Sequence, residues 1–575
     1  MNFRILKQDG PGHIGEIKIK NKKINSPNIL FIDTKRFNSP IFSEIILTNR
    51  DKDFEKPSVK FLENIELDKD FLSIKENNLL NIDETKIYVL KFANQLFRKT
   101  NDFLFKIIKN REETGYEKIL YLPAVSEPSN LSLLTYLGID LFDSSNAIIN
   151  ARKKIMFFSD GNKKINDLKE NPCTCPICIR LKKKPKEMTF DEILNHNYYM
   201  LFSEIKKIRN SIRENNLRDL VEKRVKTSPH LTSILRTLDE KYYDFLEEKT
   251  PLIESNTLNA TTIESLHRPE IKRFQKRVID RYKKPKSAKV LLLLPCSAKK
   301  PYSFSKSHSF FRRAIQSTNN SDLIHEMIIT SPMGIVPREL ELIYPASNYD
   351  IPVTGTWFED EKELINSLLE KYLKNNKYDF VISHLKEDMN EFIEKNIKID
   401  KKTCMTHPTS DESLENLKHV LKNITKDYEK VKKYDRVKEN IESFASFQFG
   451  KKIARKMIDS SKIIGRYPYQ KIIKKNKQMG MIVKEKGSIS LTLDGAKILF
   501  EEKTNIVEIA DDFELRGSVF APGVKNANEN IRIGDEVIVL KKNKLIGVGS
   551  ALMNGKDMVK LSFGESVKIR HLKKN

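Results

Sequence analysis

The sequence predicts a multidomain α/β protein with a small β-rich domain at its carboxyl end. Its 575 residues are too many for one ordinary core, so three or four domains are expected. Apolar runs typical of buried strands, such as KILYLPAV at 118–125 and VLLLL at 290–294, alternate with segments of helical apolar spacing. Towards the end, short β-rich runs are separated by Gly and Pro turns, as in GSVFAPGV at 517–524.

These changes of pattern predict four domains. The first mixes strand-like and helical stretches and ends in the basic linker RYKKPKSAK; the second is an α/β sheet domain that opens with VLLLL; the third is helical and basic; the fourth is a small β-barrel. The predicted boundaries are 1–285, 286–410, 411–484 and 485–575.

The chain carries a large positive charge. It has 103 basic and 78 acidic residues, a net charge of +25, which favours a polyanionic partner and most simply a nucleic acid. Abundant Lys, Ile and Asn also fit an AT-rich genome, and in that interpretation part of the surplus has no function. The segment KIIGRYPYQKIIKKNK at 462–477 offers Arg466, Lys471 and Lys474 to phosphates, the alternative being a solvated basic helix face.

No membrane segment is expected. No stretch approaches the roughly 20 apolar residues that a spanning helix needs, and the first residues, MNFRILKQDG, contain no apolar signal region. We therefore expect a cytoplasmic protein without a membrane partner. The oligomeric state stays open, a homodimer included.

Three of the five cysteines form a metal-binding pattern. Cys173, Cys175 and Cys178 give a CxCxxC cluster, and His196 is the best candidate for a fourth ligand. Four ligands leave no open position, so the expected zinc ion is structural. The alternative is three reduced cysteines in a surface loop.

The same region resembles the tRNA-guanine transglycosylases. Their zinc signature is followed by a His-Asn pair, which His196 and Asn197 match, and GIDLFDSSNAIINAR at 138–152 resembles the segment that holds their nucleophilic aspartate, here Asp143. The resemblance implies a (β/α) barrel. The region is short for eight complete βα units, and the family's glycine-rich base-binding loop has no counterpart upstream of Asp143, so a degenerate TIM-like barrel is expected. Asp143 is then either a nucleophile or base-binding group, or a structural carboxylate.

The segment PCSAKKPYSFSKSH at 295–308 directly follows the apolar strand VLLLL. Ligands of open α/β sheets bind beyond the carboxyl ends of strands, which makes Cys296 a candidate nucleophile. Lys299, Lys300 and Lys306 are expected to lower its pKa and supply thiolate. A buried structural cysteine is the alternative.

This segment also resembles the archaeosine synthase signature PC-x3-KPY-x2-S-x2-H, with every fixed position present. Flanking stretches resemble the same family: LHRPEIKRFQKRV, TSPMGIVPRELELIYPASNYDIPVTG and SFQFGKK. The resemblance implies an archaeal enzyme acting on 7-cyano-7-deazaguanine at tRNA position 15, in the D-loop. It implies addition of an amine donor, free lysine, across the nitrile, and a radical SAM partner enzyme that cleaves the adduct in many archaea.

The chemistry of a nitrile assigns roles to these residues. A Cys296 thiolate forms a thioimidate that an amine displaces, while His308 or Tyr302 protonates the nitrogen. Ser305 completes the signature, and Lys300 alternatively holds a phosphate. Arg338 and Glu339, with Glu341, are expected to bind the amino-acid donor unless they merely begin a solvated helix. Direct amine attack, with Cys296 only packing, stays open.

The carboxyl-terminal runs GSVFAPGV, IRIGDEVIVL and LIGVGSALM resemble a PUA domain, a small RNA-binding pseudo-barrel. Gly517, Pro522 and Gly523 would permit close approach of the backbone to RNA. Two other functions compete with the amine-adding enzyme: a base-exchanging transglycosylase that uses Asp143, and a non-catalytic tRNA-binding subunit. Neither of them needs the PC-x3-KPY segment.

Overall fold

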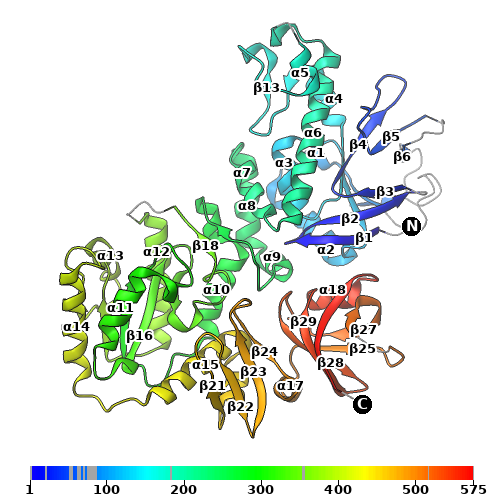
Figure 1. The fold of residues 1–575 in the computed structure, drawn as a ribbon. Helices are drawn as coiled ribbons and strands as arrows, with labels where there is room; N and C mark the ends of the chain where they lie inside the picture. The colour runs from blue at the N-terminus through cyan, green and yellow to red at the C-terminus, as the bar shows by residue number, and fades with distance from the viewer. Residues whose placement is uncertain are drawn as a thin grey trace. The chain divides into compact units, whose positions relative to one another are not determined.

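The structure is a computed structural model that describes residues 3–19, 22–50, 56–60, 67–68, 71–73, 87–181, 184–352, 357–513, 515 and 517–573. Contacts divide the chain into two compact units (Figure 1). The first unit is residues 1–250 with two short later pieces, 520–522 and 559–564, and the second holds the remainder. The four predicted domain boundaries stay a prediction.

The first unit contains two sheets. A three-stranded antiparallel sheet, β1–β2–β3, comes first in the sequence, and a curled, mostly parallel sheet follows it. The small sheet contains β1 (Phe3–Asp9), β2 (Gly12–Ile19) and β3 (Lys22–Asn25). The curled sheet has the order β6-β5-β4-β11-β10-β9-β8-β7. Its strands are β4 (Asn28–Asp33), β5 (Ile45–Thr48), β6 (Ser58–Lys60), β7 (Leu67–Asp68), β8 (Phe71–Ser73), β9 (Ile87–Leu90), β10 (Ile119–Leu122) and β11 (Leu141–Asp143).

The pairing of β11 with β4 gives this sheet its barrel character. β11 is the last of these strands in the sequence and pairs in parallel with the first, with Asp143 opposite Leu30. Joining a last strand to a first is how a (β/α) barrel closes. Within the described residues no pairing joins β6 to β7, and β7 and β8 run antiparallel. The prediction of a degenerate TIM-like barrel is confirmed.

Helices cover this sheet, and α6 is the longest of those described in this unit. Thr189 and Glu192 form a reciprocal capping box that starts α6, and apolar side chains such as Leu201 and Ile205 face the core. A short hairpin, β12 (Ile155–Met156) and β13 (Lys163–Lys164), precedes the cysteine cluster. The helices are α1 (Ala93–Phe97), α2 (Thr100–Thr114), α3 (Pro128–Tyr136), α4 (Ser145–Arg152), α5 (Pro176–Arg180), α6 (Phe190–Arg213), α7 (Leu217–Val225), α8 (Pro229–Lys241) and α9 (Tyr243–Lys249).

The second unit contains an open, doubly covered sheet of order β17-β16-β15-β19-β20. All its neighbours are parallel except the edge strand β17. The strands are β15 (Val290–Pro295), β16 (Ile324–Thr330), β17 (Gly334–Pro337), β19 (Phe380–Ser383) and β20 (Lys401–Lys402), with a separate pair β14 (Leu258–Asn259) and β18 (Tyr349–Asp350). Its helices are α10 (Pro269–Asp280), α11 (Lys306–Gln316), α12 (Glu359–Asn375), α13 (Glu387–Ile393) and α14 (Asp411–Thr425).

The apolar run of β15 follows from burial on both faces. Leu291 and Leu293 pack in one core cluster with α10 and α12, whereas Val290, Leu292 and Leu294 pack in another with α11 and α14. A strand buried on both faces has no polar side to alternate with, so its sequence is continuously hydrophobic.

The sequence predicted a helical segment over residues 411–480. The structure shows that the part following α14 is only partly helical. After α15 (Lys433–Phe449) and α16 (Lys451–Ile458) comes an antiparallel sheet: β21 (Lys462–Ile464), β22 (Lys471–Lys474), β23 (Lys477–Val483) and β24 (Ser488–Leu491). Turn chemistry explains the error. Lys475 and Asn476 both have positive φ and form the two-residue turn of a hairpin, which a helix does not permit.

The last part of the chain is a six-stranded sheet of order β26-β30-β29-β28-β25-β27, preceded by α17 (Leu493–Glu501). Its strands are β25 (Ile506–Ile509), β26 (Ser518–Phe520), β27 (Val524–Ala527), β28 (Glu536–Lys541), β29 (Lys544–Ala551) and β30 (Glu565–Leu572), with α18 (Gly555–Lys560) between the last two. In the part of the chain that the structure describes, no helix has the length and apolarity to cross a membrane.

Candidate functional site

The cysteine cluster and His196 come together as predicted. One ligand atom from each of Cys173, Cys175, Cys178 and His196 lies within 4.8 Å of the others. The Sγ atoms of Cys175 and Cys178 are 3.7 and 3.3 Å from Nδ1 of His196. The arrangement fits a single tetrahedral metal ion with no free position.

The His-Asn pair joins this cluster to the barrel. Nε2 of His196 donates to the carbonyl oxygen of Phe157 at 2.9 Å, which leaves Nδ1 for a metal. The Asn197 side chain accepts from the Phe157 amide at 2.8 Å and donates to the Ile155 carbonyl at 3.1 Å. Asn197 therefore ties the first turns of α6 to β12, and the ligand orientation depends on it.

Asp143 is a buried carboxylate, and both of its oxygens accept hydrogen bonds. Its Oδ2 accepts from the Tyr121 hydroxyl at 2.7 Å and from the Ala124 amide at 2.8 Å, and its Oδ1 accepts from the Ser145 amide at 2.7 Å. Its exposed fraction is 1%. These contacts hold the turn after β10 against the start of α4, and they favour the structural interpretation over a nucleophile.

Cys296 lies where β15 ends, beside a chain of hydroxyl groups. Tyr302 and Tyr349 hydroxyls are 2.8 Å apart, and Tyr349 also hydrogen-bonds to Oγ1 of Thr330, the last residue of β16. The Thr330 side chain also acts on the Cys296 thiol, whose pKa it lowers. Nζ of Lys300 sits 3.9 Å from the centre of the Tyr349 ring. The signature residues 296, 300 and 302 thus converge on one strand end.

The pKa values of this group differ from the sequence-based expectation. Burial raises the pKa of the Cys296 thiol, although Thr330 and Lys300 act in the other direction. The expected thiolate is therefore not the resting form. Of the three lysines, only Lys300 influences the thiol in this way, since Lys299 and Lys306 are exposed. Burial also lowers the pKa of Lys300, which brings the proton affinities of amine and thiol closer together.

His308 and Ser305 have positioning roles. The Ser305 hydroxyl accepts from the His308 amide at 3.2 Å and caps α11. Nδ1 of His308 accepts from Arg338 at 2.7 Å, and burial together with the Arg338 charge lowers the pKa of His308 to about 2. A histidine held neutral this way is a poor proton donor. Burial also raises the pKa of Tyr302, so its hydroxyl stays protonated.

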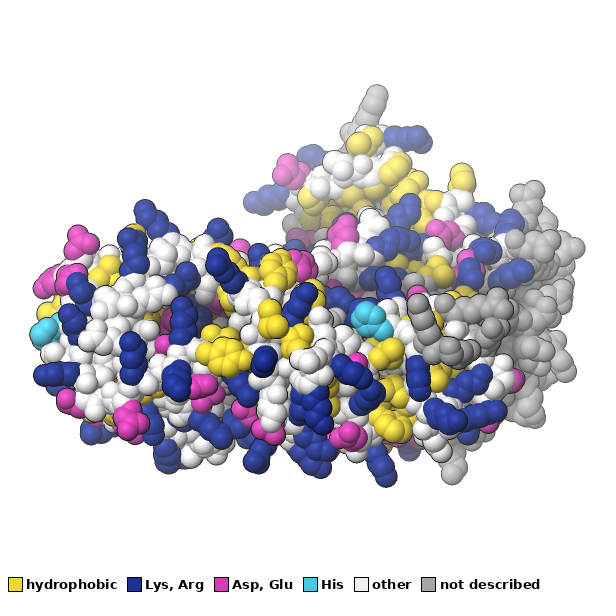
Figure 2. All heavy atoms as spheres, turned by 60° about the horizontal axis from the view of Figure 1, so that its bottom comes forward, with side chains coloured by type: hydrophobic (Ala, Val, Ile, Leu, Met, Phe, Trp, Pro, Cys, Tyr) yellow, Lys and Arg dark blue, Asp and Glu magenta, His cyan; other side chains and the backbone are white. Residues whose placement is uncertain are grey.

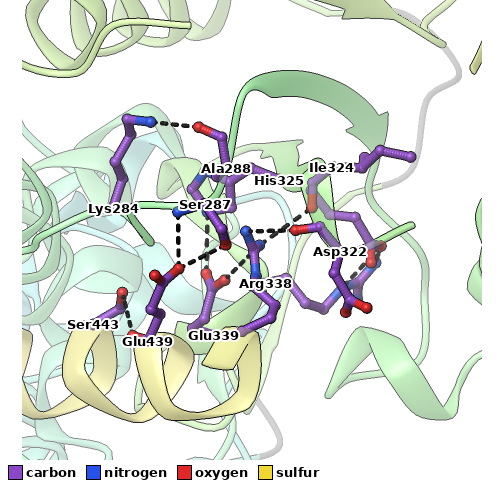
Figure 3. A network of polar contacts seen from close by, with 12 residues as sticks. Lys284, Ser287, Ala288, Asp322, Ile324, His325, Arg338, Glu339, Glu439 and Ser443 are labelled. Atoms are coloured by element: carbon purple, nitrogen blue, oxygen red, sulfur yellow. Dashed lines mark hydrogen bonds and ion pairs between the residues drawn. The ribbon is translucent and has the colours of Figure 1, made fainter. Parts of the chain in front are cut away.

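The side chains of Arg338 and Glu339 have different partners. Arg338 forms ion pairs with Glu326 and with Glu341, the latter at 3.0 Å. Glu339 instead lies in a buried polar network (Figure 3). It accepts from the Tyr282 hydroxyl at 3.1 Å and is 3.1 Å from Nε2 of His325. These contacts leave Glu339 with an exposed fraction of 8%.

Arg338 borders a cavity of about 350 Å³ in the second unit. Its other charged and polar lining residues include Arg312, Glu326, Glu339, Glu341 and Asn440. Oδ1 of Asn440 is buried and has no hydrogen-bond partner among the described residues. Cationic and anionic side chains on one wall, with an open amide oxygen, suit a small zwitterion.

Models of three known protein families match parts of the chain. They are a domain of unknown function (DUF5591) over residues 271–421, queuine tRNA-ribosyltransferase over 98–230, and the PUA domain over 508–573. The first contains Cys296, the second contains the cysteine cluster and Asp143, and the third covers the last sheet.

Similarity extends over most of the chain. The archaeosine synthase subunit alpha of Methanosarcina acetivorans is 36% identical over 509 residues, covering 86% of this chain and 80% of that protein. The archaeosine synthase of Haloferax volcanii is 36% identical, covering 84% of this chain and 82% of that protein. The chain belongs to the archaeosine synthase family. The resemblance predicted from PC-x3-KPY-x2-S-x2-H is confirmed.

More distant similarity also exists. The tRNA-guanine(15) transglycosylase of Methanobrevibacter smithii is 29% identical and covers 78% of this chain and 66% of that protein. A crystal structure of AF0587, described as a protein of unknown function, is 30% identical, with a TM-score of 0.42, and covers 52% of this chain and 98% of its own.

The residues predicted to contact RNA lie on two sheets. Arg466 is exposed in the turn between β21 and β22, and Lys471 is exposed on β22, but Lys474 donates to the Lys456 carbonyl at 2.8 Å. Around β26, Gly517 and Pro522 are exposed. Gly523 is needed for packing, because a Cβ there would lie 2.6 Å from the Phe513 ring. Packing against Phe513 is therefore sufficient to explain why a glycine stands at position 523, without any contact to RNA.

Sequence reasoning missed Thr330 and Tyr349. Both lie within the stretch 330–355 that resembles the archaeosine synthases, but neither residue type signals a role alone. Only the parallel pairing of β15 with β16, which sets Pro295 opposite Ile329, brings Thr330 level with Cys296.

Proposed function

We propose that this chain adds an amine donor, free lysine, to the nitrile of 7-cyano-7-deazaguanine at position 15 in the D-loop of tRNA. The observation that carries the proposal is the convergence of Cys296, Lys300 and Tyr302 on the Thr330–Tyr349 hydroxyl pair at the carboxyl end of β15 and β16. A partly buried thiol with a proton relay beside it suits addition to an electrophilic carbon that is weakly reactive by itself.

In the first step the Cys296 sulfur bonds to the nitrile carbon and a proton goes to the nitrile nitrogen. The product is a thioimidate. Since burial raises the pKa of the thiol and lowers that of Lys300, the lysine amine is placed to take the thiol proton as sulfur attacks. The hydroxyls of Tyr302 and Tyr349 are then the donors that can return a proton to nitrogen.

In the second step the donor amine bonds to the thioimidate carbon, the carbon–sulfur bond breaks, and Cys296 regains a proton. The product is an amidine substituted by the donor. Direct amine addition to the nitrile gives the same product without the sulfur bond, so a Cys296 variant separates the two routes.

The cavity beside Arg338 is the proposed place of the donor. Arg312 would face the amino-acid carboxylate, and Asn440 with Glu326 would face its α-ammonium group. This changes the sequence-based assignment, which gave donor binding to Arg338 and Glu339. In the revised assignment Arg338 and Glu339 both form part of the cavity wall, Arg338 held by its ion pair with Glu326 and Glu339 by its hydrogen bond from Tyr282.

The Cys3His cluster fits zinc, because three thiolates and one imidazole are the ligands of structural zinc sites. Such an ion would hold residues 173–178 against α6 and supply no chemistry to the nitrile. The further expected partners are tRNA itself and a radical SAM enzyme that cleaves the lysine adduct. Action on tRNA places the protein in the cytoplasm, and a homodimer is compatible with the proposal.

Mass analysis of tRNA nucleosides tests this function. The full chain is incubated with tRNA bearing 7-cyano-7-deazaguanine and with lysine, other amines or none. The expected result is a nucleoside heavier by one lysine, lost in Cys296→Ala. Exchange of the nitrile base for guanine, abolished by Asp143→Asn, would establish the transglycosylase alternative instead. Binding of tRNA without any new nucleoside would establish the non-catalytic alternative.

A further inference from the structure

The first unit has a surface hollow that the proposed reaction does not use. It measures about 490 Å³ and lies between the loop after β4, the end of α4 and the start of α6. Its wall includes Arg36, Phe37, Arg152, Lys154 and Phe190. We call it the Arg152 hollow. Neither Asp143 nor any member of the Cys3His cluster belongs to this wall.

Three cations of the Arg152 hollow are free to meet an anion. Arg36, Arg152 and Lys154 are exposed, and within the described residues none of them forms an ion pair. Asp191 is the single carboxylate of the wall. Unpaired cations gathered in a concavity focus a positive potential there, which selects an anionic ligand.

Two aromatic rings give the hollow a second property. The Phe37 and Phe190 rings have centroids 6.3 Å apart and are both half-buried, so part of each borders the open space. The Arg152 guanidinium carbon lies 5.4 Å from the centre of the Phe37 ring. Rings and a guanidinium plane side by side are what a nucleobase outside a helix stacks on, while neighbouring cations hold its phosphate.

One side of the hollow is formed by the start of α6. Phe190 is the first residue of that helix, between Thr189 and Glu192 of its capping box, and the same helix carries His196 of the cysteine cluster. The neighbouring segments carry exposed lysines and some exposed acidic residues. The lysines are Lys153, Lys163, Lys164, Lys184 and Lys186, and the acidic residues are Asp160, Asp167, Glu170 and Glu187. Figure 2 likewise shows Lys and Arg interspersed with Asp and Glu over the face it draws. Charge alone therefore does not locate an RNA site, whereas cations combined with rings do.

We propose that the Arg152 hollow binds one unstacked nucleotide of the tRNA substrate, with its base against Phe37 and its phosphate against Arg36 and Lys154. The inference rests on the proposed function in one respect, that the partner is a tRNA. It assigns the barrel unit an RNA-binding role separate from catalysis and from the β21–β24 and PUA sheets.

The test compares tRNA affinity of full-length variants at several salt concentrations, using an unmodified tRNA transcript as the probe. Arg36→Glu/Arg152→Glu removes two cations of the hollow. Arg98→Glu/Lys109→Glu makes the same charge change on exposed residues around α2 of the same unit. The hollow variant is expected to bind at least about tenfold more weakly, with a salt slope smaller by about one to two. The control is expected to bind within about twofold to threefold of the wild-type chain.

Phe37→Leu keeps an apolar side chain and removes the ring. Its expected effect is a loss of affinity of about fivefold to a hundredfold with an unchanged salt slope, which a merely electrostatic surface would not give. Wild-type affinity in both hollow variants, with tRNA still bound by the parent chain, overturns the inference and leaves the function intact. Failure of the parent chain to bind tRNA overturns the function itself. A change of oligomeric state in the hollow variants, without a change in tRNA affinity, marks a protein interface and also overturns the inference.

Discussion

The imidazole Nε2 of His196 donates a hydrogen bond to the carbonyl oxygen of Phe157, 2.9 Å away. Because that hydrogen bond uses Nε2, Nδ1 is the nitrogen that faces Cys178. The carbonyl is in turn fixed by Asn197, which accepts from the Phe157 amide. One residue beyond the metal ligand thus sets the direction of the ligand, as outer contacts of metal sites commonly do.

This relationship predicts that Asn197→Ala weakens metal binding without touching a ligand. Loss of the contacts to Phe157 and Ile155 frees the imidazole, and metal affinity should fall about tenfold to a hundredfold. Competition with a chromophoric zinc chelator measures it. Asn195→Ala, on the same helix, is the control and should retain wild-type affinity, because among the described residues the Asn195 side chain bonds to the Asp191 carbonyl at 2.8 Å and to no residue near the metal site.

Cys175→Ser should lower both zinc content and thermal stability, since three remaining ligands do not close a tetrahedron. Metal analysis of the purified wild-type chain is expected to find about one zinc per chain. A Cys175→Ser protein with full zinc content and an unchanged melting temperature would show that the cluster is not a metal site.

Asp143→Asn is expected to reduce stability more than activity. The amide would place a donor against one of the three donors that now point at the carboxylate, from Tyr121, Ala124 and Ser145. A mismatch of this kind costs about 1–3 kcal/mol. Chemical denaturation gives the stability, and adduct formation per folded molecule gives the activity. Unchanged stability with complete loss of activity would instead make Asp143 a catalytic group.

The free energy of unfolding should fall as pH drops below about 6.5, and His308 should contribute to that fall. Its pKa is lowered to about 2 in the folded chain, so the unfolded chain takes up a proton that the folded chain does not. Between those values stability decreases with falling pH, at up to about 1.4 kcal/mol per pH unit from this residue.

His308→Gln tests the origin of that pH dependence, since its amide oxygen can still accept from Arg338. The difference in stability between wild type and variant should shrink between pH 7 and pH 4. His384, whose pKa is lowered to about 4 by burial, remains in both proteins and acts in the same direction. His407→Gln, at an exposed position, should leave the pH profile parallel to wild type. A profile that His308→Gln leaves equally steep would contradict the assignment.

Arg466→Glu/Lys471→Glu should weaken tRNA binding and lower its salt dependence, because both side chains are exposed at the β21–β22 hairpin. Lys474 is engaged with the Lys456 carbonyl, so Lys474→Glu should have a smaller effect. Filter binding over a range of salt concentrations distinguishes the two. Equal effects per substituted residue would mean that general charge, and not this hairpin, attracts the tRNA.

Local chemistry was sufficient to predict part of the site from sequence. The spacing of Cys173, Cys175 and Cys178 allows one metal, and the apolar run of residues 290–294 requires a strand buried on both faces, with Cys296 just past its end. The helix expected over residues 462–477 is absent, because Lys475 and Asn476 adopt positive φ and turn the chain into a hairpin.

Other parts were decided only by the tertiary structure, and the reason is that burial and pairing are properties of distant segments. Lysines near Cys296 in sequence suggested a thiolate, yet burial by the surrounding core raises the thiol pKa. Glu339 was expected to bind the amino-acid donor, and only the fold shows that His325 of β16 lies 3.1 Å from its carboxylate. The sequence alone determines which residues a strand contains. The desolvation of a charged group, and the partners it finds, depend on which distant segments pack against it.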